Sequence, residues 1–516
     1  MERGGPSRRA GGRSARIAKR SAEVPLEARA VRPGMPGGAY QPLTHEQMIQ
    51  IFDAALTLLE DIGMGQATPE FIALVTSAGG TVDQNQRLHF PKAVVKDAIE
   101  TAAKEFTLHG FSSQHDTLVG GQRVHFSTGG AAVLMLEHET STFRHSSLKD
   151  VYEIGRVINA LEHVHIYVRT VVARDMETSR ELDLNTAYAV MVSTDKPIGT
   201  SFFQPEHVHE VAQMFNVALT GDPDGDEFRK RPFCIANNTF VVPPLRFAED
   251  SALCIAEQVR VGMPINLLSA GQAGATSPAT LAGSLSQALA ECLAGLTCVN
   301  LLSPGHPCTM GMWPFVSDLR TGAMSGGSGE EAVLNAAAAQ LINWIGLPSG
   351  VAAGMADSKL PDQQAGYEKG TTVTLAAQAG ANVVFESAGM LASLLACSLE
   401  TLVIDNDLLG AIARTVRGIE VDTDSLAVDV IREVVEGPGH FLGHEQTLRV
   451  MQTEYIYPSV GDRLSPEDWA DAGSLDVRAR AHQRVEEILS LPAPSHVRPE
   501  ADALIRELFP IHLDLV

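Results

Sequence analysis

Residues 347–370 read LPSGVAAGMADSKLPDQQAGYEKG, and this stretch decides the fold prediction. It begins with a run of small apolar residues (350–354) and turns at Met355 into acid, base and amide side chains. We interpret it as a buried strand whose carboxyl end opens into a ligand-binding loop, as in α/β enzymes. The alternative is an ordinary strand-to-helix loop with solvated charges.

The same sequence pattern recurs along the chain. Short apolar runs rich in small and β-branched residues alternate with amphipathic stretches, and most successive runs start 32 to 43 residues apart. This spacing fits a strand, a helix and two loops, and eight repeats predict an α/β fold of the (β/α)8 TIM-barrel type over residues 147–420. A doubly wound open sheet is the rival, but it would need a Gly-rich first turn. The eight predicted strands lie at 163–172, 196–203, 231–239, 263–271, 306–314, 348–356, 381–389 and 399–407.

Three other regions flank the predicted barrel. Residues 1–36 are rich in Arg, Gly and Ser and predict a disordered basic tail, with a transit peptide as the alternative. Residues 37–146 predict an N-terminal α+β extension that begins with a capping box formed by Thr44 and Gln47. Residues 421–516 predict a C-terminal helical region that serves packing or oligomer formation.

The bulk composition narrows the functional classes. The formal charge of −23 over 516 residues argues against nucleic acid as a partner, because phosphate binding needs clustered cations. Six cysteines stand singly among apolar residues, which predicts buried free thiols in a reducing compartment. Because no His or Cys pair has ligand spacing, we expect no metal site. We also find no apolar run of about 18 residues and no secretory signal, so we expect a cytoplasmic protein without a membrane span.

The predicted strand ends bring aromatic rings and carboxylates to one rim. Such a rim suits a quaternary ammonium, which binds aromatic faces by cation–π contact. The alternatives are that the aromatics only pack and that Asp318 and Arg320 only pair with each other. No GxSxG, HExxH or Walker motif is present, so no standard nucleophile or metal signature competes. The catalytic candidates are Asp357 and Glu386, and the substrate-binding candidates are Phe203, Asn237, Trp313, Phe315, Asp318, Arg320 and Lys359.

Helix-start signals in the sequence support the predicted alternation of strands and helices. Ser328 and Glu331 are spaced as a capping box, which predicts the start of the helix that runs through Trp344.

Three motifs resemble the trimethylamine methyltransferase superfamily: DLRTGAMSGGSGEEAVLNAAAAQLINWIGLPSG (318–350), GMADSKLPDQQAGYEKG (354–370) and GPGHFLGHEQTLR (437–449). The likeness covers roughly residues 37 to 490. It implies a (β/α)8 barrel that moves a methyl group from a methylated amine to the cob(I)alamin of a separate corrinoid protein. Founding members carry pyrrolysine. This chain uses the twenty standard residues, so it resembles the branch without pyrrolysine, which demethylates quaternary amines such as glycine betaine.

The chemistry that the resemblance implies explains why the standard nucleophile and metal motifs are absent. In the family the nucleophile is cobalt(I), so the protein needs no Ser, Cys or metal of its own. A quaternary ammonium already has a neutral amine as leaving group, and the protein then has only to orient the methyl group in a dry aromatic pocket. Arg320, Lys359 or backbone amides are candidates for a substrate carboxylate. The rivals are a demethylase of another amine or a sulfonium, and a non-catalytic binding barrel. We also expect a homo-oligomer.

Overall fold

The computed structural model describes residues 24–514. Residues 1–23 of the predicted disordered tail therefore lie outside the described residues. The remainder of that predicted tail, residues 24–36, is ordered, which corrects the prediction. Val31 and Met35 are buried, and the short strand β1 (Met35–Pro36) pairs antiparallel with β6. Ala30 is buried as well, and Arg29 pairs with Glu162 at 2.8 Å, so both apolar and polar contacts dock the segment on the body.

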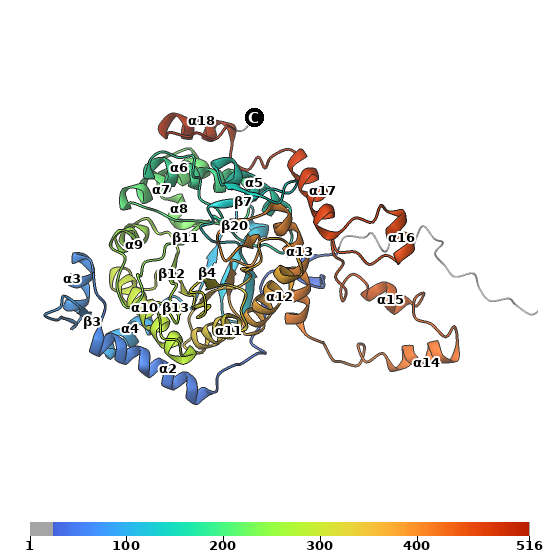
Figure 1. The fold of residues 1–516 in the computed structure, drawn as a ribbon, viewed down its shortest axis with the longest axis horizontal. Helices are drawn as coiled ribbons and strands as arrows, with labels where there is room; N and C mark the ends of the chain where they lie inside the picture. Colours follow the sequence, from blue (N-terminus) through green and yellow to red (C-terminus); the bar gives the residue numbers. More distant parts are fainter. Residues whose placement is uncertain (1–23, 515–516) are drawn as a thin grey trace, which may run out of the picture.

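The core of the molecule is a nine-stranded sheet with helices around it (Figure 1). The strand order is β1-β6-β18-β17-β14-β12-β11-β10-β9, and all neighbours except β1 and β6 run parallel. The eight parallel strands are β6 (Arg123–Phe126), β9 (Tyr167–Val168), β10 (Ile198–Thr200), β11 (Cys234–Ala236), β12 (Ile265–Ser269), β14 (Cys308–Met312), β17 (Ser349–Ala352) and β18 (Val383–Phe385).

The sheet curls until its first and last parallel strands meet. Ser127, just after β6, forms a parallel bridge with Ile166, just before β9. The His165 amide also donates to the Phe126 carbonyl at 2.8 Å. The result is a barrel-like α/β fold, whose interior is filled by strand side chains.

One predicted strand is wrong, and another takes its place. Residues 399–407 begin the helix α13 (Leu399–Arg417), which Ser398 caps by accepting from the Thr401 amide at 3.3 Å. The run at 402–404 is apolar because Leu402 and Val403 are fully buried where the helix packs on the body, not because it is a strand. The missing parallel strand is β6, which lies within the predicted N-terminal extension and pairs with β18.

Helices cover the outside of the curled sheet (Figure 1). They are α5 (Leu148–Ala160), α6 (Ser179–Ser193), α7 (Pro205–Thr220), α8 (Glu227–Lys230), α9 (Glu249–Val261), α10 (Leu281–Leu302), α11 (Gly329–Trp344), α12 (Gln363–Gln378) and α13. Among the described residues, α10 alone is long and apolar enough to cross a membrane, which corrects the expectation that no such run exists. However, 89% of its apolar window is buried inside the protein, as in a core helix. All six cysteines are buried and free, as predicted.

The N-terminal region packs α2 (His45–Thr57), α3 (Pro69–Ser77) and α4 (Lys92–Thr101) against α10. The capping box of Thr44 and Gln47 is confirmed, and a π-helical turn (Leu58–Ile62) extends the helix to Gly63. Its short strands are β2 (Thr81–Val82), β3 (Leu88–His89), β4 (Glu105–Leu108), β5 (Thr117–Gly120), β7 (Leu134–Leu136) and β8 (Phe143–His145).

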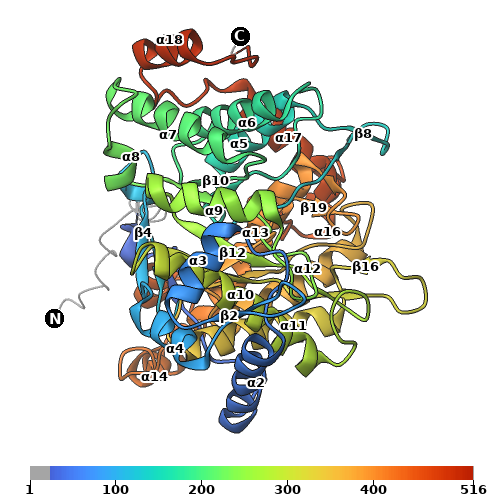
Figure 2. The ribbon, with the colours of Figure 1, turned by 90° about the vertical axis from the view of Figure 1, so that its left-hand side faces the viewer.

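Small sheets mark the carboxyl end of the parallel strands. They contain β13 (Gln272–Ala273), β15 (Phe315–Ser317), β16 (Met324–Ser325), β19 (Met390–Leu391) and β20 (Ala396–Cys397). Figure 2 shows β8 and β16 projecting at this end of the molecule and β4 at the opposite end. We call the carboxyl end the rim.

The C-terminal region is helical, as predicted. Its helices are α14 (Val428–Glu436), α15 (Glu445–Val450), α16 (Pro466–Asp471), α17 (Val477–Ser490) and α18 (Pro499–Leu508). α17 packs on α13 and α5, and α18 packs on α7. The segment with α14, α15 and α16 extends away from the barrel-like body (Figure 1).

Candidate active site at the rim

Three aromatic rings, each at the end of a different strand, meet at the rim. Trp313 directly follows β14, Phe315 begins β15 and Phe385 ends β18. The centroid of the Trp313 ring lies 5.5 Å from that of Phe385 and 6.3 Å from that of Phe315. All three side chains are buried, and the Trp313 indole nitrogen has no hydrogen-bond partner within residues 24–514. These faces form an apolar surface of the kind that binds alkylammonium groups.

Glu386 is the first residue after β18, and its side chain is completely buried. Neither carboxylate oxygen has a hydrogen-bond partner in the described chain. Gly129 and Gly130 leave room for it, because a Cβ at these positions would lie 3.1 and 3.0 Å from its two oxygens. The backbone of Glu386 adopts a strained left-handed conformation (φ 63°). Burial raises its pKa to about 8, although Lys369 and Arg169 partly oppose the shift.

A second buried glutamate, Glu331, lies close enough to Glu386 for the two charges to interact. Ser328 caps α11 by accepting from the Glu331 amide at 3.3 Å, but the Glu331 side chain does not return the bond as a capping box requires. It is fully buried, and both of its oxygens lack partners among the described residues. Burial raises the pKa of Glu331 well above its usual value, and the charges of Asp357 and Glu386 raise it further. A cation between these carboxylates would relieve both effects.

A third buried glutamate, Glu291, shows the contrasting arrangement. Its carboxylate accepts from the Leu245 amide at 2.8 Å, from Gln287 at 3.1 Å and from the Ser269 hydroxyl. Burial raises its pKa, and these bonds lower it again. Glu291 is a structural carboxylate with its hydrogen bonds made, whereas Glu331 and Glu386 are not.

Two buried cations lie near Glu386. Lys369 is paired with Asp405 at 2.8 Å, and Asp405 also accepts from the Gly389 amide at 2.8 Å. Arg169 follows β9; its guanidinium donates to the Ser201 hydroxyl at 3.2 Å, and its Nε has no partner within residues 24–514. Burial lowers the pKa of Arg169, and the charge of Glu386 is among those that oppose this. Arg169 therefore keeps a free donor for an anionic group.

Asp357, one of the predicted catalytic residues, ties the rim loops together. Its carboxylate accepts from the Ser325 hydroxyl (2.7 Å), the Gly326 amide (2.7 Å) and the Ser393 hydroxyl (2.6 Å). Its amide donates to Glu368 at 2.8 Å. Because these bonds occupy the carboxylate, we treat Asp357 as a positioning residue, and its catalytic role stays a prediction.

Asn237 directly follows β11 and is buried. Its side-chain oxygen accepts from Asn266 at 2.7 Å, and Asn266 in turn accepts from the Thr309 hydroxyl at 2.8 Å. Gly311 and Gly350 make room, since a Cβ there would lie 2.6 and 3.0 Å from the Asn266 oxygen. The same Cβ at Gly350 would lie 2.8 Å from the Phe385 ring, so this polar chain runs next to one of the three aromatic rings.

The other predicted substrate-binding residues lie at the surface. Phe203 is 50% exposed. Asp318 and Arg320 pair with each other at 2.7 Å between β15 and β16, where the Arg320 side chain is 88% exposed. This pairing lowers the pKa of Asp318 to about 2. Lys359 is exposed and donates to the Asp357 carbonyl at 2.6 Å. The structure does not bring these four side chains into the buried cluster.

Sequence reasoning missed three members of that cluster: Arg169, Glu331 and Phe385. A signal existed for Arg169, which is a charge within an apolar strand near its carboxyl end. Glu331 was hidden because its position also fits a capping box. Phe385 was hidden because an apolar residue in a strand is ordinarily core.

Two other features of the described chain could be taken for ligand sites. A hollow of about 510 Å³ lies between α2 and α10, but unpartnered buried carboxylates do not line it. His138, Glu400 and His482 place ligand atoms within 4.8 Å of one another. The two imidazole rings are stacked at 3.8 Å and nearly parallel, so one ion cannot lie in both ring planes. The 2.8 Å bond from His482 to Glu400 instead fastens α17 to α13.

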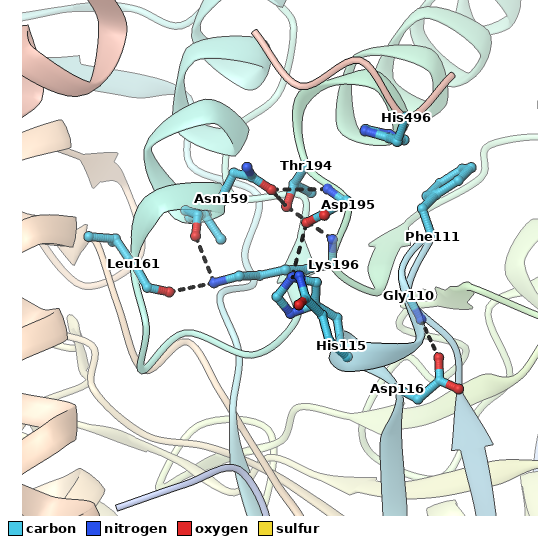
Figure 3. Close-up of polar contacts among 12 residues, drawn as sticks. Gly110, Phe111, His115, Asp116, Asn159, Leu161, Thr194, Asp195, Lys196 and His496 are labelled. Atoms are coloured by element: carbon cyan, nitrogen blue, oxygen red, sulfur yellow. Dashed lines mark hydrogen bonds and ion pairs between the residues drawn. The ribbon is translucent and has the colours of Figure 1, made fainter. Parts of the chain in front are cut away.

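The opposite, amino end of the strands also buries a charge. Lys196 precedes β10, and its ammonium donates to the carbonyls of Ile158 (2.8 Å), Leu161 and Val164 (2.6 Å). Figure 3 shows the ammonium pointing at the Leu161 carbonyl, next to the pair formed by Asp195 and His115 at 3.2 Å. Burial lowers the pKa of Lys196 to about 7. Because all three donors are used, we assign Lys196 to the structure and not to a reaction.

Comparison with known proteins places this arrangement in a family. A family model described as trimethylamine methyltransferase (MTTB) matches residues 9–509. The chain belongs to the trimethylamine methyltransferase family. A glycine betaine methyltransferase of Desulfitobacterium hafniense (strain Y51) is 29% identical over 467 residues, covering 90% of this chain and 96% of that protein.

Other members of the family are similarly distant. The trimethylamine methyltransferase MttB of Desulfitobacterium hafniense (strain DSM 10664 / DCB-2) is 31% identical over 90% of this chain and 92% of its own length. MttB1 of Methanosarcina mazei is 32% identical over 89% and 92%. Among solved structures, the monomethylamine methyltransferase MtmB of Methanosarcina barkeri gives a TM-score of 0.47 at 12% identity, covering 97% of this chain and 92% of that one.

Proposed function

We propose that this methyltransferase moves a methyl group from a quaternary amine of the betaine type to the cob(I)alamin of a partner corrinoid protein. One observation carries the proposal: two buried carboxylates without hydrogen-bond partners, Glu331 and Glu386, lie at the same rim as the aromatic rings. The names of the relatives support it, since they include a glycine betaine methyltransferase and trimethylamine methyltransferases. The proposal includes a (β/α)8 barrel, a cytoplasmic location and no resident pyrrolysine or metal.

The site suits a quaternary ammonium for electrostatic reasons. Such a cation has no N–H donor, so hydrogen-bond acceptors cannot hold it, whereas aromatic faces and carboxylate charge can. Before the ligand binds, burial favours the protonated forms of Glu331 and Glu386. When a cation enters, the carboxylates become ionised, and the low surrounding dielectric makes their attraction strong.

Arg169 favours a substrate that also carries a carboxylate. It is buried, and its Nε has no partner in the described chain. A guanidinium in this state is suited to a carboxylate through charge-assisted hydrogen bonds. Arg169 thus replaces the exposed Arg320 and Lys359 as the candidate for this role. Trimethylamine has no carboxylate, so the residue favours betaine-type substrates over it.

The residues of this chain bind and orient; the partner supplies the nucleophile. The bond between nitrogen and one methyl carbon breaks, the methyl group passes to cobalt, and the electron pair stays on nitrogen as a neutral tertiary amine. No proton has to be donated in this step. Trp313, Phe315 and Phe385 hold the methyl groups and exclude water, and the carboxylates fix the position of the nitrogen.

The purified protein should therefore convert cob(I)alamin to methylcob(III)alamin when glycine betaine is added. Free and protein-bound cobalamin are both offered, and the absorption spectrum is followed. We expect turnover with glycine betaine, and slower or no turnover with trimethylamine. No spectral change with any member of a panel of quaternary amines, tertiary amines and sulfonium compounds would contradict the enzyme proposal and leave a binding protein.

A further inference from the structure

The loop that follows β18, residues 386–389, holds Glu386 in an unusual backbone conformation. Its φ of 63° is left-handed, which is unfavourable for a residue other than glycine and persists only where the surrounding structure enforces it. One side of the loop is fixed by Ser127, which follows β6. The Ser127 carbonyl accepts from the Ser387 amide at 3.0 Å and from the Ser387 hydroxyl at 2.9 Å.

The other side of the loop is fixed by α13 and the residue that caps it. The Gly389 amide donates to the Asp405 carboxylate at 2.8 Å, and the Gly389 carbonyl accepts from the Ser398 amide at 3.3 Å. Gly389 has φ 88°, and a Cβ at this position would lie 2.6 Å from the Leu402 side chain, so both features favour glycine. Residues 386–389 are therefore held between β6 and α13.

The carboxylate that binds Gly389 has a counter-ion of its own. Lys369 of α12 donates to the same oxygen of Asp405, Oδ2, at 2.8 Å, and the two side chains are 1% and 3% exposed. Burial raises the pKa of Asp405, and the charge of Lys369 and the bonds to Lys369 and Gly389 lower it again. A buried ion pair contributes little net stability, because desolvation of the two charges offsets their attraction. Stability alone therefore does not account for a charged pair at this place.

We propose that Asp405 is a positioning residue for Glu386, and that Lys369 is its counter-ion. The inference rests on the proposed function, in which Glu386 binds the substrate cation. An ionised carboxylate accepts from an amide more strongly than a neutral group does, and the bond to Gly389 holds the loop against the strain at Glu386. Lys369 also acts on Glu386 directly: burial raises the pKa of Glu386, and the charges of Lys369 and Arg169 lower it.

Two uncharged double variants test the bond to Gly389. Lys369→Met with Asp405→Asn keeps a side-chain oxygen that can accept from the Gly389 amide, whereas Lys369→Met with Asp405→Leu has none. Neither pair leaves an unpaired buried charge, so both proteins should fold. At pH 9 we expect kcat/KM for glycine betaine to be about 100-fold lower in the second variant than in the first, because a displaced Glu386 no longer meets the cation.

Hydrogen exchange gives a second readout that does not need turnover. A peptide covering residues 385–397, followed by mass spectrometry, should exchange faster in the second variant than in the first. Asp407→Ala is the control. The Asp407 carboxylate also lies on α13 and accepts from the amides of residues 459–461 at 2.7 to 2.9 Å. Its loss should change neither kcat/KM nor exchange in the peptide.

The pH profile tests the direct action of Lys369. Both double variants lose its charge, so the rise of kcat/KM with pH should move to higher pH than in the wild type. Arg169 and Glu331, the other charged groups that interact with Glu386, are kept in both variants.

Equal kcat/KM in the two double variants would overturn the inference, whether or not exchange differs, because the bond to Gly389 would then not serve the site. Equal exchange would overturn it as well, since the loop would then be held without Asp405. If the wild-type protein transfers no methyl group from any amine, the proposed function fails by itself. The exchange comparison still decides in that case whether Asp405 holds the loop of Glu386.

Discussion

Ionisable side chains are buried at both ends of the curled sheet, but only the one at the amino end has all of its hydrogen bonds made. At the amino end, the Lys196 ammonium donates to three carbonyls, and its donors are all used. At the rim, the carboxylates of Glu331 and Glu386 have no hydrogen-bond partner among the described residues. Burying charge is costly in both places. At the amino end the protein itself compensates the cost, whereas at the rim a cationic ligand would do so.

The comparison predicts that Lys196 matters for folding alone. Lys196→Met leaves three buried carbonyls without a donor, and we expect a loss of about 3 kcal/mol in the free energy of unfolding. The rate of methyl transfer per folded molecule should stay within about twofold, because the residue lies far from the rim. Urea unfolding and a methyl-transfer assay measure the two effects. Lys149→Met, on a 77% exposed side chain, is the control that should change neither. A stable but inactive Lys196→Met protein would contradict the assignment of Lys196 to stability alone.

Glu386 should behave in the opposite way. Glu386→Gln removes the charge that holds the ammonium, and we expect kcat/KM to fall about 100-fold, which corresponds to about 2.7 kcal/mol. Stability at pH 8 should rise, because an isolated buried carboxylate is lost. Glu291→Gln is the matched control: it breaks bonds to Ser269 or Leu245, so it should lower stability and leave kcat/KM nearly unchanged. Equal activity losses in both variants would show that burial alone, and not the missing partners, sets the effect.

The pH dependence of kcat/KM and of stability tests the role of Glu386 further. The pKa of Glu386 is raised to about 8 in the folded protein, so the free enzyme holds it protonated below that pH. A cation needs the ionised form, and kcat/KM should therefore rise about tenfold per pH unit from pH 6 and level off above pH 8. The stability contribution has the reverse sign: it is fully present below the unfolded pKa near 4.5 and is lost as the pH rises through 8. Glu386→Gln should flatten both profiles, and an unchanged profile in that variant would assign the titration elsewhere.

Trp313 should have a moderate effect on binding. Trp313→Ala removes an aromatic face that is packed at 5.5 Å against Phe385, and we expect glycine betaine binding to weaken by about 1–2 kcal/mol. Trp313→Phe, which keeps an aromatic face, should recover most of this loss. Calorimetric titration gives the dissociation constants. An unchanged constant in Trp313→Ala would place the ring in the packing.

The smallest effect is expected at the exposed pair on the rim. Asp318 and Arg320 are bonded to each other, and the Arg320 side chain is 88% exposed. Exposed pairs contribute little, so Arg320→Ala should leave kcat/KM for glycine betaine with free cobalamin within about twofold. A large rise in KM would show that Arg320, and not Arg169, binds the substrate carboxylate.

Much of the fold could be predicted from the sequence because the repeats are regular. Seven of the eight predicted strands lie in the sheet, since a buried parallel strand needs a short apolar run wherever it occurs. The eighth was wrong because residues 399–407 carry the same kind of apolar run on the buried face of α13. β6 was missed as a member of the main sheet because it precedes the regular alternation, and only its pairing with β18 reveals its place.

Less of the site could be predicted, because burial and bonding depend on partners that are remote in sequence. Trp313, Phe315 and Glu386 were found from their places at strand ends, and the structure buries all three. Glu331 fits a capping box in the sequence, and only the structure shows that its side chain turns inward. Likewise, nothing in a single sequence tells that the carboxylate of Asp357 is used up by Ser325, Gly326 and Ser393.

The most direct test of the unpartnered carboxylates is a count of protons released when the ligand binds. Glycine betaine is titrated into the protein at pH 7 by calorimetry in two buffers of different ionisation enthalpy. Because burial favours the protonated forms of both Glu331 and Glu386 in the free protein, a bound cation should drive off at least one proton, and about one fewer in Glu386→Gln. Binding with the same heat in both buffers, and hence no proton released, would contradict the account.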